Sequence, residues 1–288
     1  MTDVDYCLDT LYKSKSNFIK AFWFLKREHF EALAAIYSFA HRIDHCVDDI
    51  TEHAVAIQQL KFWTKELDCI FDLNQKPSHP ITRCLYDIHQ KKPWPPNPFY
   101  QLIEGMTHDI ESATISSKTT LDNYCYKVAA TIGELIFHII QPERKNIKEI
   151  AYHCGLYMQK INILRDIGED DRKERCYIPD DFLVIQQIDK PLISLNTSQI
   201  DTIVNYLNEQ IEQHGQEIQR LTSKDQLPTF VNLILLTYSQ LHLEILRQKN
   251  KLMTHKIKLG GMSKLFIFGK LLCHKILKQP LLAAGSAA

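Results

Sequence analysis

Two pairs of aspartates have the spacing of a metal-binding helix face. Asp44 and Asp48 are four residues apart, and so are Asp166 and Asp170. Residues four apart lie on one face of an α-helix, so each pair projects two carboxylates in one direction. Mg2+ prefers a few carboxylates with water and phosphate oxygens over a closed protein cage. One pair alone is also typical of a solvated helix face, but two facing pairs could hold a metal-bound diphosphate.

The second aspartate pair belongs to a longer polar ridge. Gln159 and Asn162 precede Asp166 and Asp170 at helical offsets, so two amide side chains share the face of the acids. The residues between them are largely apolar. Acids on an otherwise buried helix cost several kcal/mol unless they are paired or bind a metal. This ridge is therefore the more specific of the two signals.

The elements that must position these residues are predicted to be helices. Only nine glycines occur, and no alternating β-branched run bounded by turns is present. Apolar residues recur at helical spacing over 18–37 and 121–140. Proline and clustered polar residues predict connections at 93–98, 141–145 and 178–198. We expect one all-α domain over residues 1–288.

Composition limits the class of function. The formal net charge is zero, which argues against nucleic acid as the main partner. Eight cysteines without a CxxC pair argue against a zinc site and favour reduced thiols. The beginning of the sequence shows no apolar signal stretch, so we expect a cytoplasmic protein.

The segment 256–278 differs from the rest of the chain. It mixes apolar residues with five lysines after position 256, a pattern that predicts a basic amphipathic helix. Its apolar run is too short and too charged to span a bilayer. The segment either packs on the core or makes peripheral contact with the inner membrane surface.

The motifs resemble those of a known family. Residues 159–170, QKINILRDIGED, and 175–179, RCYIP, are similar to the second aspartate-rich signature of squalene and phytoene synthases, and Asp44 to Asp48 to the first. Residues 124–133, YCYKVAATIG, resemble the segment between them. These enzymes join two prenyl diphosphates head to head. The resemblance extends from about residue 17 to residue 238.

The resemblance implies an isoprenoid-synthase-type helical bundle around a central cavity, with two or three Mg2+ ions and prenyl diphosphate substrates. The implied metal ligands are Asp44, Asp48, Asn162, Asp166 and Asp170, and the four aspartates, Tyr124 and Gln159 form the catalytic set. Further substrate contacts are implied at Asn17, His41, Arg42, Asp109, Asn162, Arg165, Tyr177 and Tyr238. Val128 and Gly133 would line the dry prenyl tunnel, although small residues at helical spacing are also typical of close helix contacts.

Four positions depart from the family pattern, and one of them is Asn17, where the family has a serine before phenylalanine. The arginine three residues before the first aspartate is replaced by His41, with Arg42 beside it, and the acid after that aspartate by His45. An arginine expected on the C-terminal side is Lys256, which keeps the charge but loses bidentate phosphate geometry. None of these changes removes one of the four aspartates.

Several functions are compatible with these features. Condensation of two farnesyl diphosphates to presqualene diphosphate or a squalene-type C30 product is favoured by the Gln159-Lys160 step, which looks like squalene synthases. The alternatives are a phytoene synthase using two geranylgeranyl diphosphates, and a non-catalytic relative acting as an assembly or lipid-binding factor. A head-to-tail prenyltransferase or terpene cyclase normally shows Asp-Asp-x-x-Asp instead. Use of NADPH stays open, because no glycine-rich dinucleotide loop is visible and the family does not use one.

Overall fold

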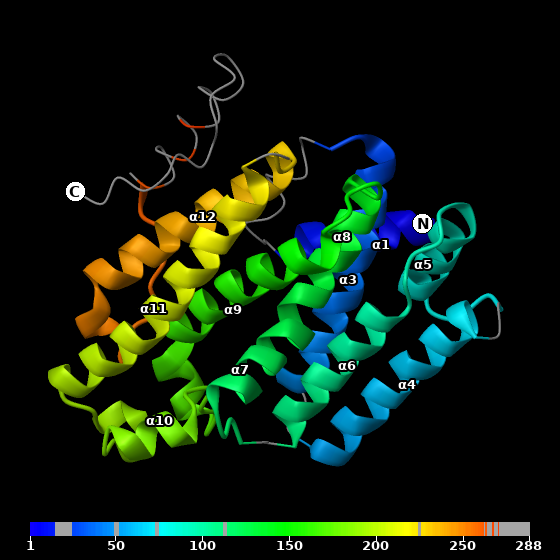
Figure 1. Ribbon diagram of the computed structural model, residues 1–288. Helices are drawn as coiled ribbons and strands as arrows, with labels where there is room; N and C mark the ends of the chain where they lie inside the picture. The colour runs from blue at the N-terminus through cyan, green and yellow to red at the C-terminus, as the bar shows by residue number, and fades with distance from the viewer. Residues whose placement is uncertain are drawn as a thin grey trace. The chain divides into compact units, whose positions relative to one another are not determined.

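A computed structural model describes residues 1–14, 25–48, 52–72, 75–111, 114–223, 226–261, 263, 267 and 270. In this part of the chain the regular elements are helices and no strand occurs, which confirms the all-α prediction (Figure 1). The α-helices are α1 (Asp3–Lys13), α3 (Arg27–Asp48), α4 (His53–Phe71), α5 (Pro80–Lys91), α6 (Asn97–Ile110), α7 (Lys118–Cys125), α8 (Thr131–Ile140), α9 (Ile147–Arg172), α10 (Asp180–Ile185), α11 (Thr197–Thr222) and α12 (Thr229–Arg247). A π-helical turn, η1 (Tyr126–Ala130), joins α7 to α8, and two 3-10 turns are η2 (Leu192–Ser194) and η3 (Lys249–Lys251).

The chain divides into two compact units. Unit 1 comprises Met1–Ala113 and Tyr126–Gly155, and unit 2 comprises Thr114–Cys125 and Leu156–Ala288. Helix α9 begins in unit 1 and ends in unit 2. The expectation of a single domain stays a prediction.

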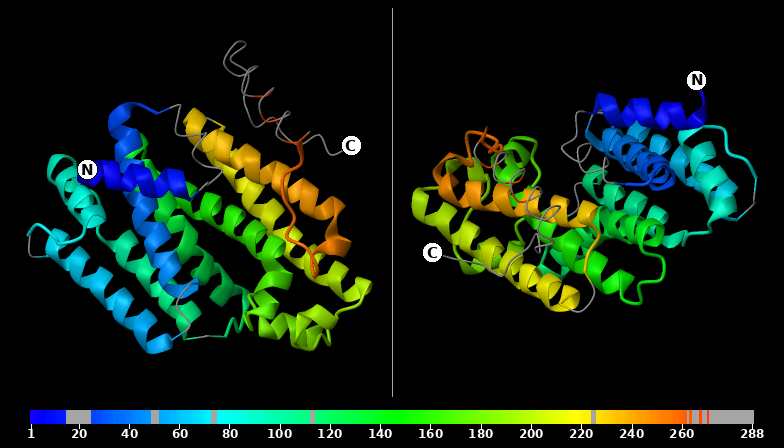
Figure 2. Two further views of the ribbon diagram at one scale, coloured as in Figure 1. Left: turned by 180° about the vertical axis from the view of Figure 1, so that it is seen from behind. Right: turned by 90° about the horizontal axis from the view of Figure 1, so that it is seen from above.

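Unit 1 is built on α3, which contacts α1, α4, α5, α6 and α8. Helix α1 lies against α3 and α5 (Figure 2). Phe39 of α3 is the centre of an aromatic core, with its ring edge-on to Trp63 at 5.7 Å and to Phe99 at 5.5 Å. Such contacts add to the hydrophobic burial that fixes the helices.

A buried carboxylate connects two helices of unit 1. Glu66 of α4 is 5% exposed and accepts hydrogen bonds from the Ser78 and His79 amides, at 3.1 and 2.8 Å, where α5 begins. The hydroxyls of Ser78 and Thr82 donate to the same carboxylate. These bonds satisfy backbone donors that a helix start leaves without partners.

In unit 2, α11 and α12 are neighbouring antiparallel helices (Figures 1 and 2). By length and composition alone α12 could cross a membrane, but half of that stretch is buried, and a core helix of a soluble protein passes the same test.

On α9, a Cβ added at Gly168 would lie 2.6 Å from the Leu252 carbonyl oxygen and 2.7 Å from the Met253 Cα. Glycine therefore lets the backbone after η3 lie directly against α9.

The connection predicted at 178–198 is only partly irregular, because it contains α10 and η2. Pro179 and the two aspartates after it favour the start of a helix as well as a break. Residues 141–145 contain no helix, as predicted, whereas α6 begins at Asn97, inside the connection predicted at 93–98. Of the predicted amphipathic segment 256–278, residues 261, 263, 267 and 270 are helical and 256–260 are not. The rest of that segment lies outside the described residues.

Candidate active site

The polar ridge of α9 is present as the sequence predicts. Gln159, Asn162, Asp166 and Asp170 all lie on this helix and are half-buried. Asn162 Nδ2 donates to Gln159 Oε1 at 3.3 Å, whereas Asn162 Oδ1 is buried and makes no hydrogen bond within the described part of the chain. A buried acceptor without a donor is costly, so this oxygen is suited to a ligand.

Asp166 is bound by two cations of its own unit. The guanidinium of Arg165 donates from Nε at 2.8 Å and from a second nitrogen to the other oxygen. Lys256 Nζ lies 3.1 Å from Asp166 Oδ1 and 3.1 Å from Glu169 Oε2. The bond from Lys256 holds the pKa of Glu169 below its usual range. Sequence reasoning noted Lys256 but missed Glu169, whose only signal was its place inside the motif.

Asp170 lies one helical turn beyond Asp166. Burial, and after it the charge of Asp166, raises the pKa of Asp170 to about 7. A carboxylate pair under mutual repulsion gains free energy from a bound cation. Together with the Asn162 oxygen, the two acids form an oxygen donor set that fits Mg2+. In the structure as described, no group of three or more His, Cys, Asp or Glu side chains converges on one metal position.

Two predicted aromatic residues of unit 2 contact each other. Tyr124 of α7 is buried and stacks on Tyr177, with ring centroids 5.0 Å apart and an interplanar angle of 20°. Tyr238 of α12 is half-buried. Burial acts to lower the pKa of Arg165, but the bond to Asp166 and the nearby Tyr238 outweigh it and raise the value. Tyr238 is therefore close enough to Arg165 to interact with its charge, whereas Tyr124 and Tyr177 form a stacked pair of their own.

A buried ion pair behind the ridge was not predicted. Lys160 is 0% exposed, and its Nζ donates to Asp122 of α7 at 2.5 Å and to Gln210 of α11 at 2.8 Å. His214 Nε2 is 3.3 Å from the same nitrogen. Burial lowers the pKa of Lys160, against the effect of Asp122. The sequence shows the residue types but not that three distant helices bring them together.

The first acidic motif lies on α3 in unit 1. Asp44 is exposed, and the side chain of Asp48 lies outside the described residues. Nε2 of His41 is 3.1 Å from Nε2 of His45. Arg42 is exposed and donates to the Tyr6 hydroxyl at 2.9 Å.

The remaining predicted residues of unit 1 have varied surroundings. Asp109 is half-buried on α6, and Asn17 lies outside the described residues. Val128 is 7% exposed, and a Cβ added at Gly105 would lie 2.8 Å from its Cγ1. A Cβ added at Gly133 would lie 3.4 Å from the Ala151 Cβ. These small residues make close helix contacts; a role in lining a tunnel stays a prediction.

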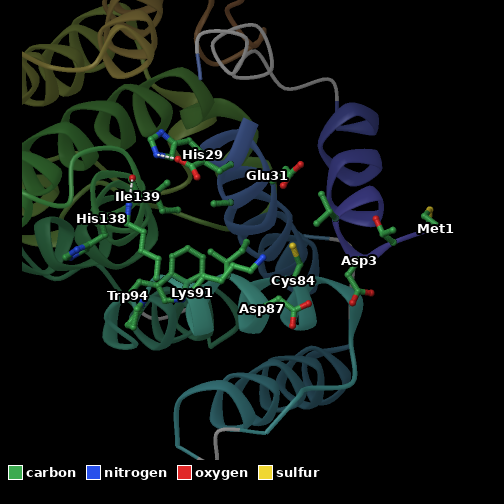
Figure 3. A pocket seen from close by; sticks show the side chains of 17 residues that line it. Met1, Asp3, His29, Glu31, Cys84, Asp87, Lys91, Trp94, His138 and Ile139 are labelled. Atoms are coloured by element: carbon green, nitrogen blue, oxygen red, sulfur yellow. Dashed lines mark hydrogen bonds and ion pairs between the residues drawn. The ribbon is translucent and has the colours of Figure 1, made fainter. Parts of the chain in front are cut away.

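The two aspartate pairs belong to different units, so their facing arrangement also stays a prediction. Unit 1 contains a cavity of about 560 Å3 among α1, α3, α5 and α8 (Figure 3). None of the predicted site residues lines it. Two of its four acids, Asp3 and Glu31, are held by Arg83 at 2.6 Å and Arg27 at 2.8 Å. The cavity is therefore no part of the predicted chemistry.

Comparison with known proteins decides the family. A family model described as squalene/phytoene synthase matches residues 11–262, most of the chain. The chain belongs to the squalene/phytoene synthase family. The α9 motif and the α3 motif both fall within the matched range.

Curated relatives in this squalene/phytoene synthase family include plant and cyanobacterial proteins. The chain is 35% identical over 158 residues to phytoene synthase 2, chloroplastic, from Solanum lycopersicum. The aligned stretch covers 53% of this chain and 50% of that protein. It is 30% identical over 168 residues to phytoene synthase from Arthrospira platensis, 54% of each. The matches span about half the length of these relatives.

Solved structures show the same fold. A dehydrosqualene synthase in complex with ligand superposes with a TM-score of 0.80 at 23% identity, over 95% of this chain and 96% of that one. Squalene synthase HpnC from Alicyclobacillus acidocaldarius gives 0.76 at 20% identity, over 86% and 94%. At these identities the likeness shows the all-α synthase fold alone.

Proposed function

We propose that this protein is a Mg2+-dependent transferase that condenses two farnesyl diphosphates head to head, releasing diphosphate and forming presqualene diphosphate or a squalene-type C30 product. The observation that carries the proposal is the donor set on α9. Asn162 Oδ1 is buried without a hydrogen-bond donor, and the pKa of Asp170 is raised by burial and by Asp166. Bound Mg2+ would supply charge stabilisation to the departing diphosphate.

The chain's own cations support the same step. Arg165 and Lys256 flank Asp166 and can turn toward diphosphate oxygens when a ligand occupies the ridge. When the bond between the allylic carbon and diphosphate breaks, the electron pair leaves with the diphosphate. The double bond of the second substrate then supplies the electrons of the new carbon–carbon bond, and a proton is lost.

The aromatic pair has a separate role in this scheme. The stacked rings of Tyr124 and Tyr177 offer an electron-rich face to a carbocation. Gln159 belongs with Tyr124 to the predicted catalytic set and lines the reaction centre. Apolar neighbours keep water from quenching the cation.

The test is to incubate the purified protein with Mg2+ and farnesyl diphosphate. Pyrophosphate release is measured, and the products in the organic extract are identified by mass analysis. Asp166→Asn and Asp170→Asn should lose about 100-fold or more in turnover while staying folded. Asp189→Asn, an exposed acid of the same unit, is the matched control and should keep turnover. Full activity in both α9 variants would refute the assignment.

A second candidate is condensation of two geranylgeranyl diphosphates to phytoene, which is favoured by the names of the curated relatives. Parallel incubation with each diphosphate separates the two substrates. No pyrophosphate release from either would support the non-catalytic alternative, which the histidines at 41 and 45 favour. NADPH added in a further arm tests whether the product is reduced.

We also propose peripheral membrane contact through the basic segment 256–278. The full chain should sediment with anionic vesicles, whereas a variant whose lysines in this segment are replaced by glutamine should stay in the supernatant. Equal sedimentation of both proteins would exclude this contact.

A further inference from the structure

Two histidines on the first acidic helix direct their ring nitrogens at each other. His41 and His45 are one turn apart on α3, and their Nε2 atoms are 3.1 Å apart. The ring centroids are separated by 4.2 Å, and the planes are inclined by 75°. Tyr37, one turn earlier, stacks on His41 at 5.8 Å. Both imidazoles are half-buried, so their orientation is defined while their edge stays accessible.

This distance suits two nitrogens bound to one metal ion. Histidines at i and i+4 on one helix face are a recurring zinc-binding element. A metal lying about 2.0–2.1 Å from each nitrogen would be contacted at an angle of roughly 95–100°. That angle lies between those of octahedral and tetrahedral coordination. Both lone pairs must point at the metal, and rotation about χ2, a torsion with a broad minimum in histidine, allows the rings to reorient.

We propose that His41 and His45 form a binding site for a transition-metal dication of the Zn2+ or Ni2+ type. Imidazole nitrogen suits these metals, whereas carboxylate and water oxygens suit Mg2+. The site is therefore distinct in chemistry from the oxygen donor set on α9.

Metal binding changes the hydrogen position of one ring. In the metal-free pair, one Nε2 donates a hydrogen to the other at 3.1 Å. Both Nε2 lone pairs are needed for a metal, so the donating ring must take the tautomer with its hydrogen on Nδ1. A neutral imidazole reaches that tautomer without gaining or losing charge.

A nearby cysteine does not belong to the site. Cys46 is 6% exposed, and its Sγ donates to the Arg42 carbonyl at 3.1 Å. Burial raises the pKa of this thiol, which disfavours the thiolate that binds metals. The two imidazoles therefore carry the recognition.

The experiment is calorimetric titration of untagged full-length protein with Ni2+ in the presence of excess Mg2+. The wild-type chain should bind one Ni2+ per molecule. His41→Ala and His45→Ala should each weaken Ni2+ binding by at least about 10- to 100-fold. Loss of an outer-shell partner alone has an effect of that size, and these histidines would be direct ligands. His53→Ala, an exposed histidine of α4 with no histidine one turn away, is the matched control and should bind as wild type. Co2+ absorption gives a second, spectroscopic readout.

Each outcome of these titrations either supports the proposed metal site or overturns it. Absence of stoichiometric Ni2+ binding by the wild-type chain, or binding by His41→Ala and His45→Ala as tight as that of the wild type, would overturn the site and leave a hydrogen-bonded histidine pair. Loss in only one of these variants, or in His53→Ala as well, would also overturn it. Circular dichroism of each metal-free variant, with His41→Gln and His45→Gln as substitutes for a misfolded alanine variant, separates ligand loss from unfolding. Asp166→Asn should keep Ni2+ binding, so the test is independent of the proposed condensation activity.

Discussion

Arg165 and Asp166 are consecutive residues of α9, and the guanidinium holds both oxygens of the carboxylate next to it. Lys256 reaches the same carboxylate from a segment 90 residues further along the chain, at 3.1 Å. The charge of Asp166 is therefore balanced by cations of its own unit. A divalent metal has to compete with these cations, and a diphosphate can recruit them.

Replacing Lys256 should separate its competition with Mg2+ from its binding to diphosphate. In Lys256→Gln, Mg2+ binding without diphosphate should strengthen by about 0.5–1 kcal/mol, roughly two- to fivefold, because a competing partly exposed cation is lost. Binding of diphosphate with Mg2+ should weaken. Calorimetry measures both. Lys249→Gln is the control, since Lys249 is equally exposed and pairs at 2.7 Å with Asp201 instead. The same change in both variants would contradict the specific role of Lys256.

The close approach at Gly168 leads to a second prediction. In Gly168→Ala the new methyl group would overlap the backbone of Leu252 and Met253, which cannot yield as a flexible side chain can. We expect a loss of about 1–3 kcal/mol in the free energy of unfolding. Gly215→Ala on α11 meets only Tyr157, at 3.6 Å, and should instead gain about 0.5–1 kcal/mol. Urea unfolding of the two variants measures the difference; equal stability of both would show that the segment moves away freely.

The buried ion pair gives a third prediction. Lys160→Met removes the buried cation from Asp122 and leaves that carboxylate with only the half-exposed Lys118, at 2.9 Å, so we expect a loss of up to about 3–5 kcal/mol. Adding Asp122→Leu should recover much of that loss, because no charge is then left unpaired. Lys190→Met breaks a bond of similar length, 2.6 Å to Asp180, but Lys190 is 44% exposed and the change should cost under about 1 kcal/mol. Equal costs at both lysines would mean that burial does not strengthen the pair.

A buried histidine predicts how stability depends on pH. His242 of α12 is 7% exposed, and burial lowers its pKa to about 4. The unfolded chain takes up a proton near the ordinary value of about 6.5. Stability is therefore complete above that pH and is lost as the pH falls from about 6.5 toward 4, by about 2 kcal/mol at pH 5.

Urea unfolding at pH 7.5 and pH 5 measures this loss. His242→Leu should reduce the loss between the two pH values by about 2 kcal/mol, whereas replacement of the exposed His255 by Gln should leave it unchanged. Burial also lowers the pKa of other histidines, so part of the slope should persist. An unchanged slope in His242→Leu would assign the dependence to those other groups.

The predictable part of the site is local. Spacing along one helix placed Asp166 and Asp170 on α9 with Asn162, because helix geometry alone fixes that relation. The cation supplied by Lys256 depends on how closely a distant segment approaches Gly168, and no periodicity encodes such an approach. Lys160 is similar: a lysine in a helix is normally interpreted as solvated, and only three packed helices make it a buried partner.

The fold was predictable at the same level. Helical spacing and the scarcity of glycine indicated the all-α class. The period over 121–140 did not reveal the π-helical turn at Tyr126–Ala130, because five residues of irregular pitch do not disturb an apolar pattern enough. The helix α10 was hidden by Pro179, which starts helices and also ends them.

The π-helical turn determines which face of the helix each later residue occupies. A turn wider than 3.6 residues rotates every later side chain around the axis relative to a regular helix. Thr131 stabilises this geometry, since its hydroxyl donates to the Lys127 carbonyl at 2.7 Å. Deleting one residue from 126–130 would exchange the neighbours of Val128 and of Gly133 while leaving the composition nearly intact. Chain length at this point, as much as residue identity, therefore determines which side chains of α8 face inward.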